Sequence, residues 1–421
     1  MTQTDAWVRP NDQPFAAGPH LPPPPPPPPP SAPAPSPAAA PVGRRPGWAA
    51  LALASLGSAA LASGLTVGGL GLADPDPLPA ATSPAAATPG DPLVPPAADG
   101  VDWSAVADAV SPSVVAIQVQ SSSAAGQGSG VVLDTEGHVL TNNHVATGAG
   151  ANADIRIVLS DGRTFDDISV VGLDPATDLA VLQIADPPAD LVPATLGSSD
   201  AVDVGDPVMA VGNPLGLSDT VTTGIVSAVN RPVTTSGSQE QSPFEQGGVA
   251  AETVVTNAIQ TDAAVNPGNS GGALVDATGA LVGIPSSIAG TATTQGGQSG
   301  SIGVGFAIPV NEATRIADEL IASGTATHAW LGVSLQDGTA MADGVTRQGA
   351  EVADVTGGTP AADAGLQPGD VVTGIDGEAV SGSESLTAQV RERAPGDAVT
   401  LDVVRGGAQQ QFAVTLGTRE S

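Results

Sequence analysis

The sequence contains no cysteine, which excludes disulfide bonds and zinc sites built from thiolates. This absence leaves the compartment open, because a protein without cysteine folds in reducing and oxidising surroundings alike. The sequence also contains no tyrosine, and only 2% of its residues are aromatic. The hydrophobic cores must therefore be built mainly from valine, leucine, isoleucine and alanine.

Positive charge is also scarce. Lysine is absent, and 12 basic residues face 43 acidic ones, for a formal net charge of −31. Such an acidic surface repels nucleic acids and anionic lipids, which argues against phosphate-binding functions. The 421 residues leave room for two or three domains of ordinary size.

The first 46 residues have too little apolar bulk to fold into a core. The run from Pro22 to Pro30 favours an extended polyproline II rod. We therefore predict a disordered proline-rich tail over residues 1–46. Two functions for it remain open: a spacer, or a docking site for a proline-binding module.

An uncharged stretch rich in alanine, leucine and glycine follows at residues 47–72. A helix over it is about 37 Å long, enough to cross a hydrocarbon core of ~30 Å. Arg44 and Arg45 precede it and aspartates follow, which predicts a transmembrane helix with a cytoplasmic N-terminus. A cleaved signal peptide is the alternative, disfavoured because the preceding tail is much longer than a typical charged n-region. Residues 73–100 form a linker rich in proline and alanine.

Short apolar segments separated by turn residues begin after residue 100. Their lengths and spacing predict antiparallel β-structure in barrels or a sandwich rather than βαβ units. They divide into two groups near residue 190, and helices are expected at 102–110 and 311–323. The expected strands are 114–119, 130–133, 139–141, 155–159, 170–173, 179–184, 208–211, 221–229, 253–260, 273–275, 281–284 and 303–308.

Ser270 lies in the segment Asn-Pro-Gly-Asn-Ser-Gly-Gly, between residues that favour sharp turns. A serine hydroxyl becomes a useful nucleophile only beside a base, and neighbouring amides must point at the developing oxyanion. Gly268, Gly271 and Gly272 give the backbone the freedom for such a turn. The motif alone also fits an ordinary loop, so a base and an acid are needed elsewhere in the chain.

Two upstream residues supply these partners. His144 follows an apolar strand in Thr-Asn-Asn-His-Val, whereas His20 lies in the proline-rich tail and His138 beside a turn. Asp178 directly precedes another strand, where it is either a turn residue or the acid that orients the imidazole. The order histidine, aspartate, serine is the triad order of two-barrel proteases of the chymotrypsin type.

In these contexts the chain resembles the HtrA/Deg family of trypsin-like serine endopeptidases. The segments Val-Gly-Asn-Pro-Leu-Gly at 211–216 and Gly-Phe-Ala-Ile-Pro at 305–309 are also similar to that family, and the resemblance covers about residues 103–418. It implies two six-stranded β-barrels over residues 101–324, with the site in the cleft between them. It also implies catalysis by His144, Asp178 and Ser270, and an oxyanion hole from the amides of Gly268, Asn269 and Ser270.

The chain departs from the family pattern at Pro285. The family more often has Asn-Thr after the isoleucine at this point, in a segment that lines the specificity pocket. The resemblance implies that small aliphatic residues are preferred before the cleaved bond. Pro285 leaves this preference open for the present chain. No acidic residue stands before Ser270 at a position that favours lysine or arginine substrates.

Residues 325–421 resemble a PDZ domain, a small β-barrel with two helices. Leu331, Gly332 and Val333 look like its carboxylate-binding loop, and residues 359–372 carry the most specific part of the resemblance. A helix is expected at 385–393 beside the groove, where a peptide C-terminus adds to a sheet edge. A structural or oligomerising module is the alternative.

Together these features predict a membrane-anchored, extracytoplasmic serine endopeptidase of protein quality control, whose substrates are unfolded or misfolded proteins. The alternative is a chaperone or scaffold that binds exposed C-termini while the protease rests. The resemblance further implies a homotrimer assembled through residues 102–110, and no metal ion or organic cofactor.

Overall fold

The structure is a computed structural model that describes residues 100–150, 153–213, 220–236, 253–287, 301 and 303–419. These residues belong to one compact unit, residues 84–421. The expected proline-rich tail, transmembrane helix and most of the linker lie outside the described residues. Within the described ranges, none of the helices is long and apolar enough to cross a bilayer.

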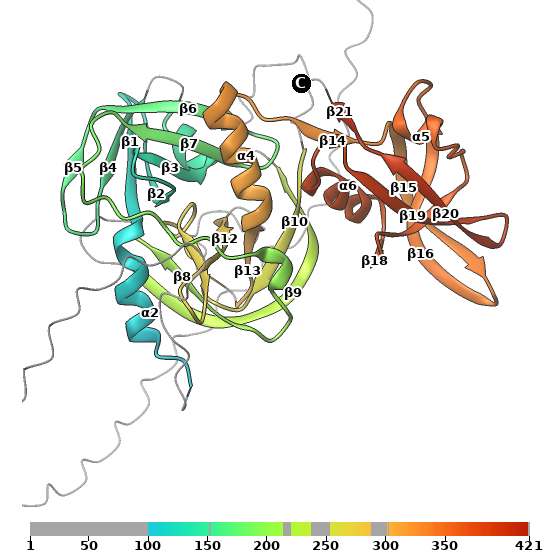
Figure 1. Ribbon diagram of the computed structural model, residues 1–421, viewed down its shortest axis with the longest axis horizontal. Coiled ribbons are helices and arrows are strands. Elements are labelled where there is room, and N and C mark those ends of the chain that lie inside the picture. Colours follow the sequence, from blue (N-terminus) through green and yellow to red (C-terminus); the bar gives the residue numbers. More distant parts are fainter. Residues whose placement is uncertain are drawn as a thin grey trace, which may run out of the picture. The chain divides into compact units, whose positions relative to one another are not determined.

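The strands before residue 190 form one antiparallel sheet (Figure 1) with β2 as its central strand. It contains seven strands in the order β5-β4-β1-β2-β3-β7-β6, where the sequence predicted a six-stranded barrel. The additional strand is β5, a two-residue pairing with β4 that the apolar pattern does not reveal. The strands are β1 (Val114–Gln120), β2 (Ala125–Val132), β3 (His138–Asn142), β4 (Asp154–Val158), β5 (Thr164–Phe165), β6 (Ile168–Asp174) and β7 (Leu179–Ile184).

The strands after residue 200 close into a six-stranded barrel, as expected. Their order around the barrel is β10-β13-β12-β11-β8-β9. The strands are β8 (Pro207–Gly212), β9 (Thr220–Ser236), β10 (Thr253–Thr261), β11 (Ala273–Asp276), β12 (Leu281–Pro285) and β13 (Gly305–Pro309).

Two helices pack against these sheets. Helix α2 (Trp103–Val110) begins at Asp102, whose carboxylate accepts a hydrogen bond from the amide of Ala105 and so caps the first turn. Helix α4 (Val310–Ser323) ends at Gly324, which adopts the left-handed conformation (φ 77°) that favours glycine. Side chains of both helices share one apolar core with β-strands of both sheets, so this core joins the two halves.

The C-terminal domain has its own core and a sheet in the order β15-β16-β17-β19-β20, with β18 paired to β17. Helix α6 (Ser383–Glu392) lies where the sequence predicts the helix beside the groove. The other elements are β14 (His328–Trp330), β15 (Val333–Ala342), β16 (Val345–Val355), α5 (Pro360–Asp363), β17 (Val371–Ile375), β18 (Glu378–Ala379), β19 (Ala398–Arg405), β20 (Ala408–Thr415) and β21 (Gly417–Arg419).

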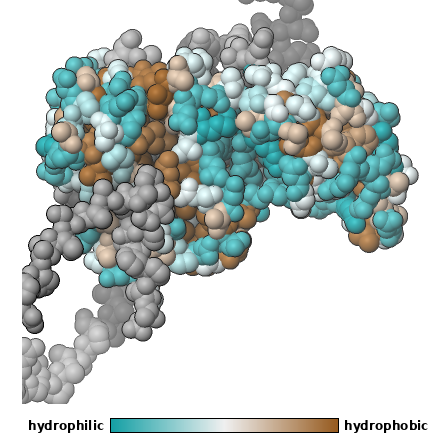
Figure 2. Space-filling model, viewed as in Figure 1, coloured by the Kyte–Doolittle hydropathy of each residue, from teal (hydrophilic) through white to brown (hydrophobic). Residues whose placement is uncertain are grey.

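The surface drawn in Figure 2 is a mixture in which hydrophilic residues predominate, consistent with the acidic composition. Larger apolar side chains that remain exposed include Val204 and Met341. Single apolar side chains on a surface are normal and carry no functional argument by themselves.

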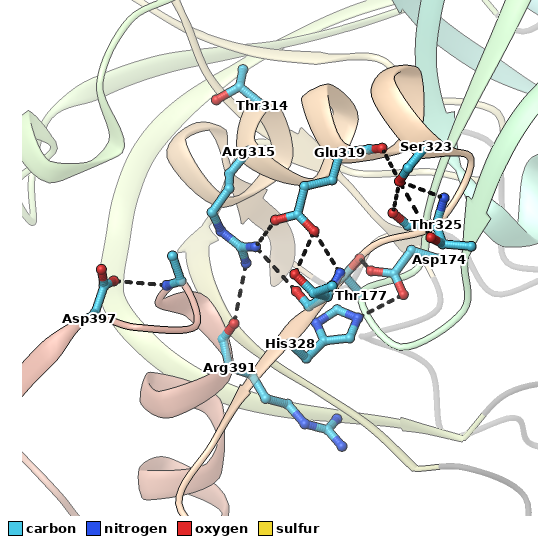
Figure 3. A network of polar contacts seen from close by, with 12 residues as sticks. Asp174, Thr177, Thr314, Arg315, Glu319, Ser323, Thr325, His328, Arg391 and Asp397 are labelled. Atoms are coloured by element: carbon cyan, nitrogen blue, oxygen red, sulfur yellow. Dashed lines mark hydrogen bonds and ion pairs between the residues drawn. The ribbon is translucent and has the colours of Figure 1, made fainter. Parts of the chain in front are cut away.

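A polar network joins α4 to the strand that enters the C-terminal domain (Figure 3). Arg315 and Glu319, one turn apart on α4, form an ion pair of 3.0 Å. Glu319 also accepts hydrogen bonds from the amide and hydroxyl of Thr327. The next residue, His328, lies 3.0 Å from the carboxylate of Asp174 at the end of β6. The network therefore fixes the entry into β14 against the first sheet.

Glu312 is a buried carboxyl on α4, only 3% exposed, and its Oε2 atom has no hydrogen-bond partner within the described residues. Burial raises its pKa from 4.5 to about 8, and the negative charge of Glu392 on α6 adds to the shift. Glu392 accepts a hydrogen bond of 2.7 Å from Asn257 on β10. The neutral form of Glu312 is therefore the one that the folded state favours.

We predict that Glu312 makes stability depend on pH. Between pH 4.5 and about 8 the folded state holds a proton on Glu312 that the unfolded state releases, so stability falls as pH rises. The decrease in the free energy of unfolding that Glu312 causes over this pH range is at most roughly 5 kcal/mol. Urea unfolding of wild type and Glu312→Gln at pH 5 and pH 8 measures it, and the Gln variant should show the flatter pH dependence.

Asp318→Asn is the matched control, because Asp318 is an exposed carboxylate on the same helix. It should keep the pH dependence of the wild type. Parallel pH curves for wild type and Glu312→Gln would contradict the assignment.

Candidate active site

The register of two paired strands brings His144 close to Asp178. In the antiparallel pair β3–β7, Asn142 at the end of β3 lies opposite Leu179 at the start of β7. The chain leaves β3 into the short helix α3 (Asn143–Thr147), which carries His144 in its first turn. The amide of Asn143 donates to the carbonyl oxygen of Asp178 at 3.0 Å, which locks this junction.

Asp178 adopts the left-handed backbone conformation (φ 59°), one of four non-glycine residues with positive φ among those described. Asp and Asn tolerate this region better than other residues, at some conformational cost. The side-chain amide of Asn142 donates to the carbonyl of Asp178 at 3.0 Å and supports the conformation. Backbone outliers of this kind concentrate at functional sites.

Both carboxylate oxygens of Asp178 accept hydrogen bonds. Oδ1 accepts from the backbone amide of His144 at 3.0 Å, and Oδ2 lies 2.9 Å from Nδ1 of the same residue. The hydroxyl of Ser286 donates to Oδ2 at 3.1 Å. The two side chains are largely shielded, with 26% of His144 and 14% of Asp178 exposed. This arrangement places the proton on Nδ1 and leaves Nε2 free to act as a base.

The loop that carries Ser270 depends on glycine for its geometry. Gly268 and Gly271 have φ values of 105° and 79°, in the region that favours glycine. A Cβ atom at Gly271 would clash with the carbonyl of Ser129 and the hydroxyl of Thr141. Ser270 itself is 2% exposed. Gly272, the third glycine expected to supply this freedom, does not have a positive φ, but a Cβ atom there would clash with the carbonyl of Val211.

Ser129 on β2 fastens this loop to the first sheet. Its hydroxyl donates to the carbonyl of Gly268 at 2.7 Å and accepts from the amide of Asn213 at 2.9 Å. Its amide donates to the carbonyl of Ser270 at 2.9 Å. Ser129 is fully buried, so these groups have no access to water as an alternative partner.

The three amides assigned to the oxyanion hole differ in their contacts. The amide of Asn269 donates to the carbonyl of Asn266 at 3.0 Å, within the turn. Across the described residues, the amides of Gly268 and Ser270 donate to no acceptor. In this conformation the amides of Gly268 and Ser270 are therefore unengaged within the described ranges, whereas that of Asn269 is not.

The hydroxyl of Ser270 is engaged by Ser287. Ser270 Oγ lies 2.6 Å from Ser287 Oγ and accepts from the amide of Ser287 at 3.0 Å. Among the described residues it makes no hydrogen bond with His144. The structure thus joins His144 to Asp178 directly, and links Asp178 and Ser270 to the adjacent residues Ser286 and Ser287.

The residues assigned to carboxylate binding line a cavity of about 360 Å³, whose wall also includes residues 173–176 at the end of β6. Leu331 and Gly332 connect β14 to β15, which begins at Val333, and Gly332 has a φ of 81°. Leu386 and Val390 of α6 line the same cavity. A groove between a strand and a helix with a flexible glycine turn at one end suits an extended peptide.

One group of potential metal ligands occurs among the described residues, formed by Asp134, Glu136 and His138 in the turn between β2 and β3. Asp134 accepts from the amides of both other residues, and lies 2.6 Å from Nδ1 of His138. Burial opposes ionisation of Asp134, but the hydrogen bonds and charge of His138 lower its pKa overall. These contacts describe a capped turn, and we assign no metal ion to it.

Sequence reasoning missed three residues of this site: Ser129, Ser286 and Ser287. The segment with Pro285 was expected to line the specificity pocket, but no pattern singled out the two serines that follow. Serine is common in loops, and only the fold shows which hydroxyl faces a buried partner. Ser129 lies in a strand whose partner loop is more than a hundred residues away in sequence.

Comparisons with known proteins agree with the geometry. Residues 128–284 match the trypsin-like peptidase domain, and residues 329–416 match the PDZ domain. The chain is 45% identical over 323 residues to "Serine protease PepD" of Mycobacterium tuberculosis, covering 75% of this chain and 66% of that protein. It is 39% identical over 308 residues to "Putative serine protease HhoA" of Synechocystis, covering 70% of this chain and 71% of that protein.

Other relatives extend beyond the matched region. "Periplasmic serine endoprotease DegP" of Escherichia coli is 41% identical over 69% of this chain, but the match spans 56% of that relative. The matches thus span between 56% and 71% of the length of these curated relatives. Among solved structures, "HtrA-type protease AlgW with tripeptide" matches 76% of this chain and 98% of its own, with 36% identity and a TM-score of 0.53.

We predict that Ser129→Ala destabilises the fold, because it leaves the Gly268 carbonyl and the Asn213 amide buried without a partner. Such losses cost about 1–3 kcal/mol in unfolding free energy. Urea unfolding followed by tryptophan fluorescence measures the change. Ser169→Ala, at an exposed serine on β6, is the control and should stay within about 0.5 kcal/mol of wild type. Equal stability of the two variants would refute the role of Ser129.

Proposed function

Because the chain belongs to the HtrA family of trypsin-like serine proteases, we propose that it is a serine endopeptidase that cleaves unfolded or misfolded proteins. The observation that carries the proposal is the 2.9 Å contact between His144 Nδ1 and Asp178, beside a buried serine in a glycine-rich turn. Names of relatives add support, since they are serine proteases and several are periplasmic endoproteases.

In the proposed mechanism, Ser270 Oγ attacks the carbonyl carbon of a peptide bond while His144 Nε2 takes the hydroxyl proton. Asp178 stabilises the imidazolium that forms. The amides of Gly268 and Ser270 stabilise the oxyanion of the tetrahedral intermediate. His144 then gives the proton to the leaving amine, and an acyl-enzyme remains on Ser270. Water, deprotonated by His144, releases the acid and restores the serine.

The C-terminal domain is proposed to bind peptide C-termini. A peptide that adds to the edge of β15 places its carboxylate at the loop of Leu331, Gly332 and Val333, whose amides serve as donors. Apolar side chains of α6 offer a pocket for the last residue of the peptide. Such binding would bring exposed C-termini of damaged proteins to the protease.

The site of action is proposed to be extracytoplasmic, with a single membrane helix at residues 47–72, the N-terminus in the cytoplasm and the folded domains outside. The support is the sequence pattern of arginines before and aspartates after the apolar stretch, together with the periplasmic names of relatives. A homotrimer through α2 is proposed from the family resemblance. In this chain Trp103 of α2 packs on the protomer's own core.

A second candidate function is a chaperone or scaffold that binds C-termini while the protease rests. One observation favours it: the hydroxyl of Ser270 is hydrogen-bonded to Ser287 and not to His144. A nucleophile held in this way is unready for attack until it rotates.

We predict that Ser270→Ala abolishes casein hydrolysis by the full-length protein, because the attacking oxygen is lost. A fluorophosphonate probe should label wild type at Ser270, identified by mass spectrometry, and should not label the variant. Ser169→Ala is the control and should behave like wild type in both assays.

Two outcomes would count against the proposal that this chain is a protease. Hydrolysis by Ser270→Ala at the wild-type rate would refute the mechanism. Prevention of aggregation by wild type, without cleavage at any temperature tested, would favour the chaperone.

A further inference from the structure

We propose that Ser287 is a positioning residue that holds the hydroxyl of Ser270 in a resting orientation, so that catalysis requires this contact to break. The inference rests on the proposed function and concerns the regulation of the same site. Its basis is the pair of contacts between Ser270 Oγ and Ser287, at 2.6 Å to the hydroxyl and 3.0 Å to the amide.

These contacts compete with the reaction geometry. Attack requires the Ser270 hydroxyl to donate its proton to His144 Nε2. In the observed orientation the hydroxyl accepts from the Ser287 amide, and it either donates to or accepts from the Ser287 hydroxyl. Where Ser270 is the donor, its only proton is committed to Ser287. In either case no hydrogen bond joins Ser270 Oγ to His144 within the described residues, so Oγ must move to reach the imidazole.

The backbone that leads into Ser287 is held by two contacts. The carbonyl of Pro285 accepts from the amide of Gly271 at 3.0 Å. The amide of Ser286 donates to the carbonyl of Phe306 on β13, also at 3.0 Å. Strand β12 and its neighbours therefore hold the two residues before Ser287 and lead the chain to the hydroxyl of Ser270.

The two adjacent serines act in opposite directions. Ser286 donates to the Asp178 carboxylate and so supports the acid that orients His144. Ser287 engages the hydroxyl of Ser270 and so opposes its hydrogen bond to His144. Substitution of the first should slow the reaction, whereas substitution of the second should speed it.

The size of the effect follows from a single hydrogen bond. A neutral hydrogen bond shifts an equilibrium by roughly two- to tenfold, and Ser270 is buried at 2% exposure, where water competes poorly. Ser287→Ala removes the hydroxyl but keeps the amide, so only part of the contact is lost. We therefore expect a gain of about two- to tenfold in the population ready for attack.

The test uses four variants of the full-length protein: Ser287→Ala, Ser287→Thr, Ser286→Ala and Ser169→Ala. Two rates are measured for each, fluorophosphonate labelling of Ser270 and hydrolysis of a peptide substrate, with kcat and KM separated. Ser287→Ala should raise the labelling rate and kcat by two- to tenfold and change KM little. Ser287→Thr keeps the hydroxyl and should match wild type, as should Ser169→Ala. Ser286→Ala should be slower than wild type.

Labelling by Ser287→Ala at or below the wild-type rate overturns the proposal. Equal rates for Ser287→Ala and Ser287→Thr do so as well, since the hydroxyl would then make no difference. Failure of the proposed function gives a different pattern. In that case Ser270→Ala retains the hydrolysis, or wild type is labelled but cleaves no protein or peptide, whereas the labelling rates still report on Ser287.

Discussion

The carboxylate of Asp178 is the contact on which the site depends. It receives the imidazole and the backbone amide of His144, and it also receives the hydroxyl of Ser286 from the second barrel. The left-handed backbone of Asp178 brings the carboxylate to this position, and strand pairing between β3 and β7 keeps it there. A largely shielded carboxylate that accepts from three donors is held in one orientation, and this in turn orients the imidazole of His144.

A second constraint holds the nucleophile's loop, and it crosses from one sheet to the other. Ser129 of the first sheet binds the carbonyls of Gly268 and Ser270 in a loop of the second barrel. The glycines allow the sharp turn of this loop, and the hydrogen bonds of Ser129 fix the loop against the first sheet. Ser287 adds a further contact, on the hydroxyl itself. His144 and Asp178 are thus joined by one set of contacts, and Ser270 is held by another, so the orientation of the Ser270 hydroxyl can change without disruption of the His144–Asp178 pair.

Much of this could be predicted from the sequence because it is local. The alternating apolar segments gave the β-rich fold, Asp102 and Gly324 mark the ends of helices, and the motifs around His144, Asp178 and Ser270 pointed to the chemistry. Other features depend on distant parts of the chain. The two-residue strand β5 is too short to leave a pattern, and Ser129, Ser286 and Ser287 resemble any loop or strand serine until the sheets are folded. The raised pKa of Glu312 could not be predicted from the sequence either, because the pattern of an amphipathic helix does not show which of its carboxyl groups is buried.

The central claim is that Asp178 makes His144 a base for Ser270. The most direct measurement is the rate at which a fluorophosphonate modifies Ser270 in wild type and in Asp178→Asn, both checked for native unfolding midpoints. Loss of the carboxylate favours the wrong imidazole tautomer, and in triad proteases the corresponding change lowers turnover by about 10⁴-fold. The account predicts a fall of several orders of magnitude in the labelling rate. Labelling of the folded Asn variant at the wild-type rate would contradict it.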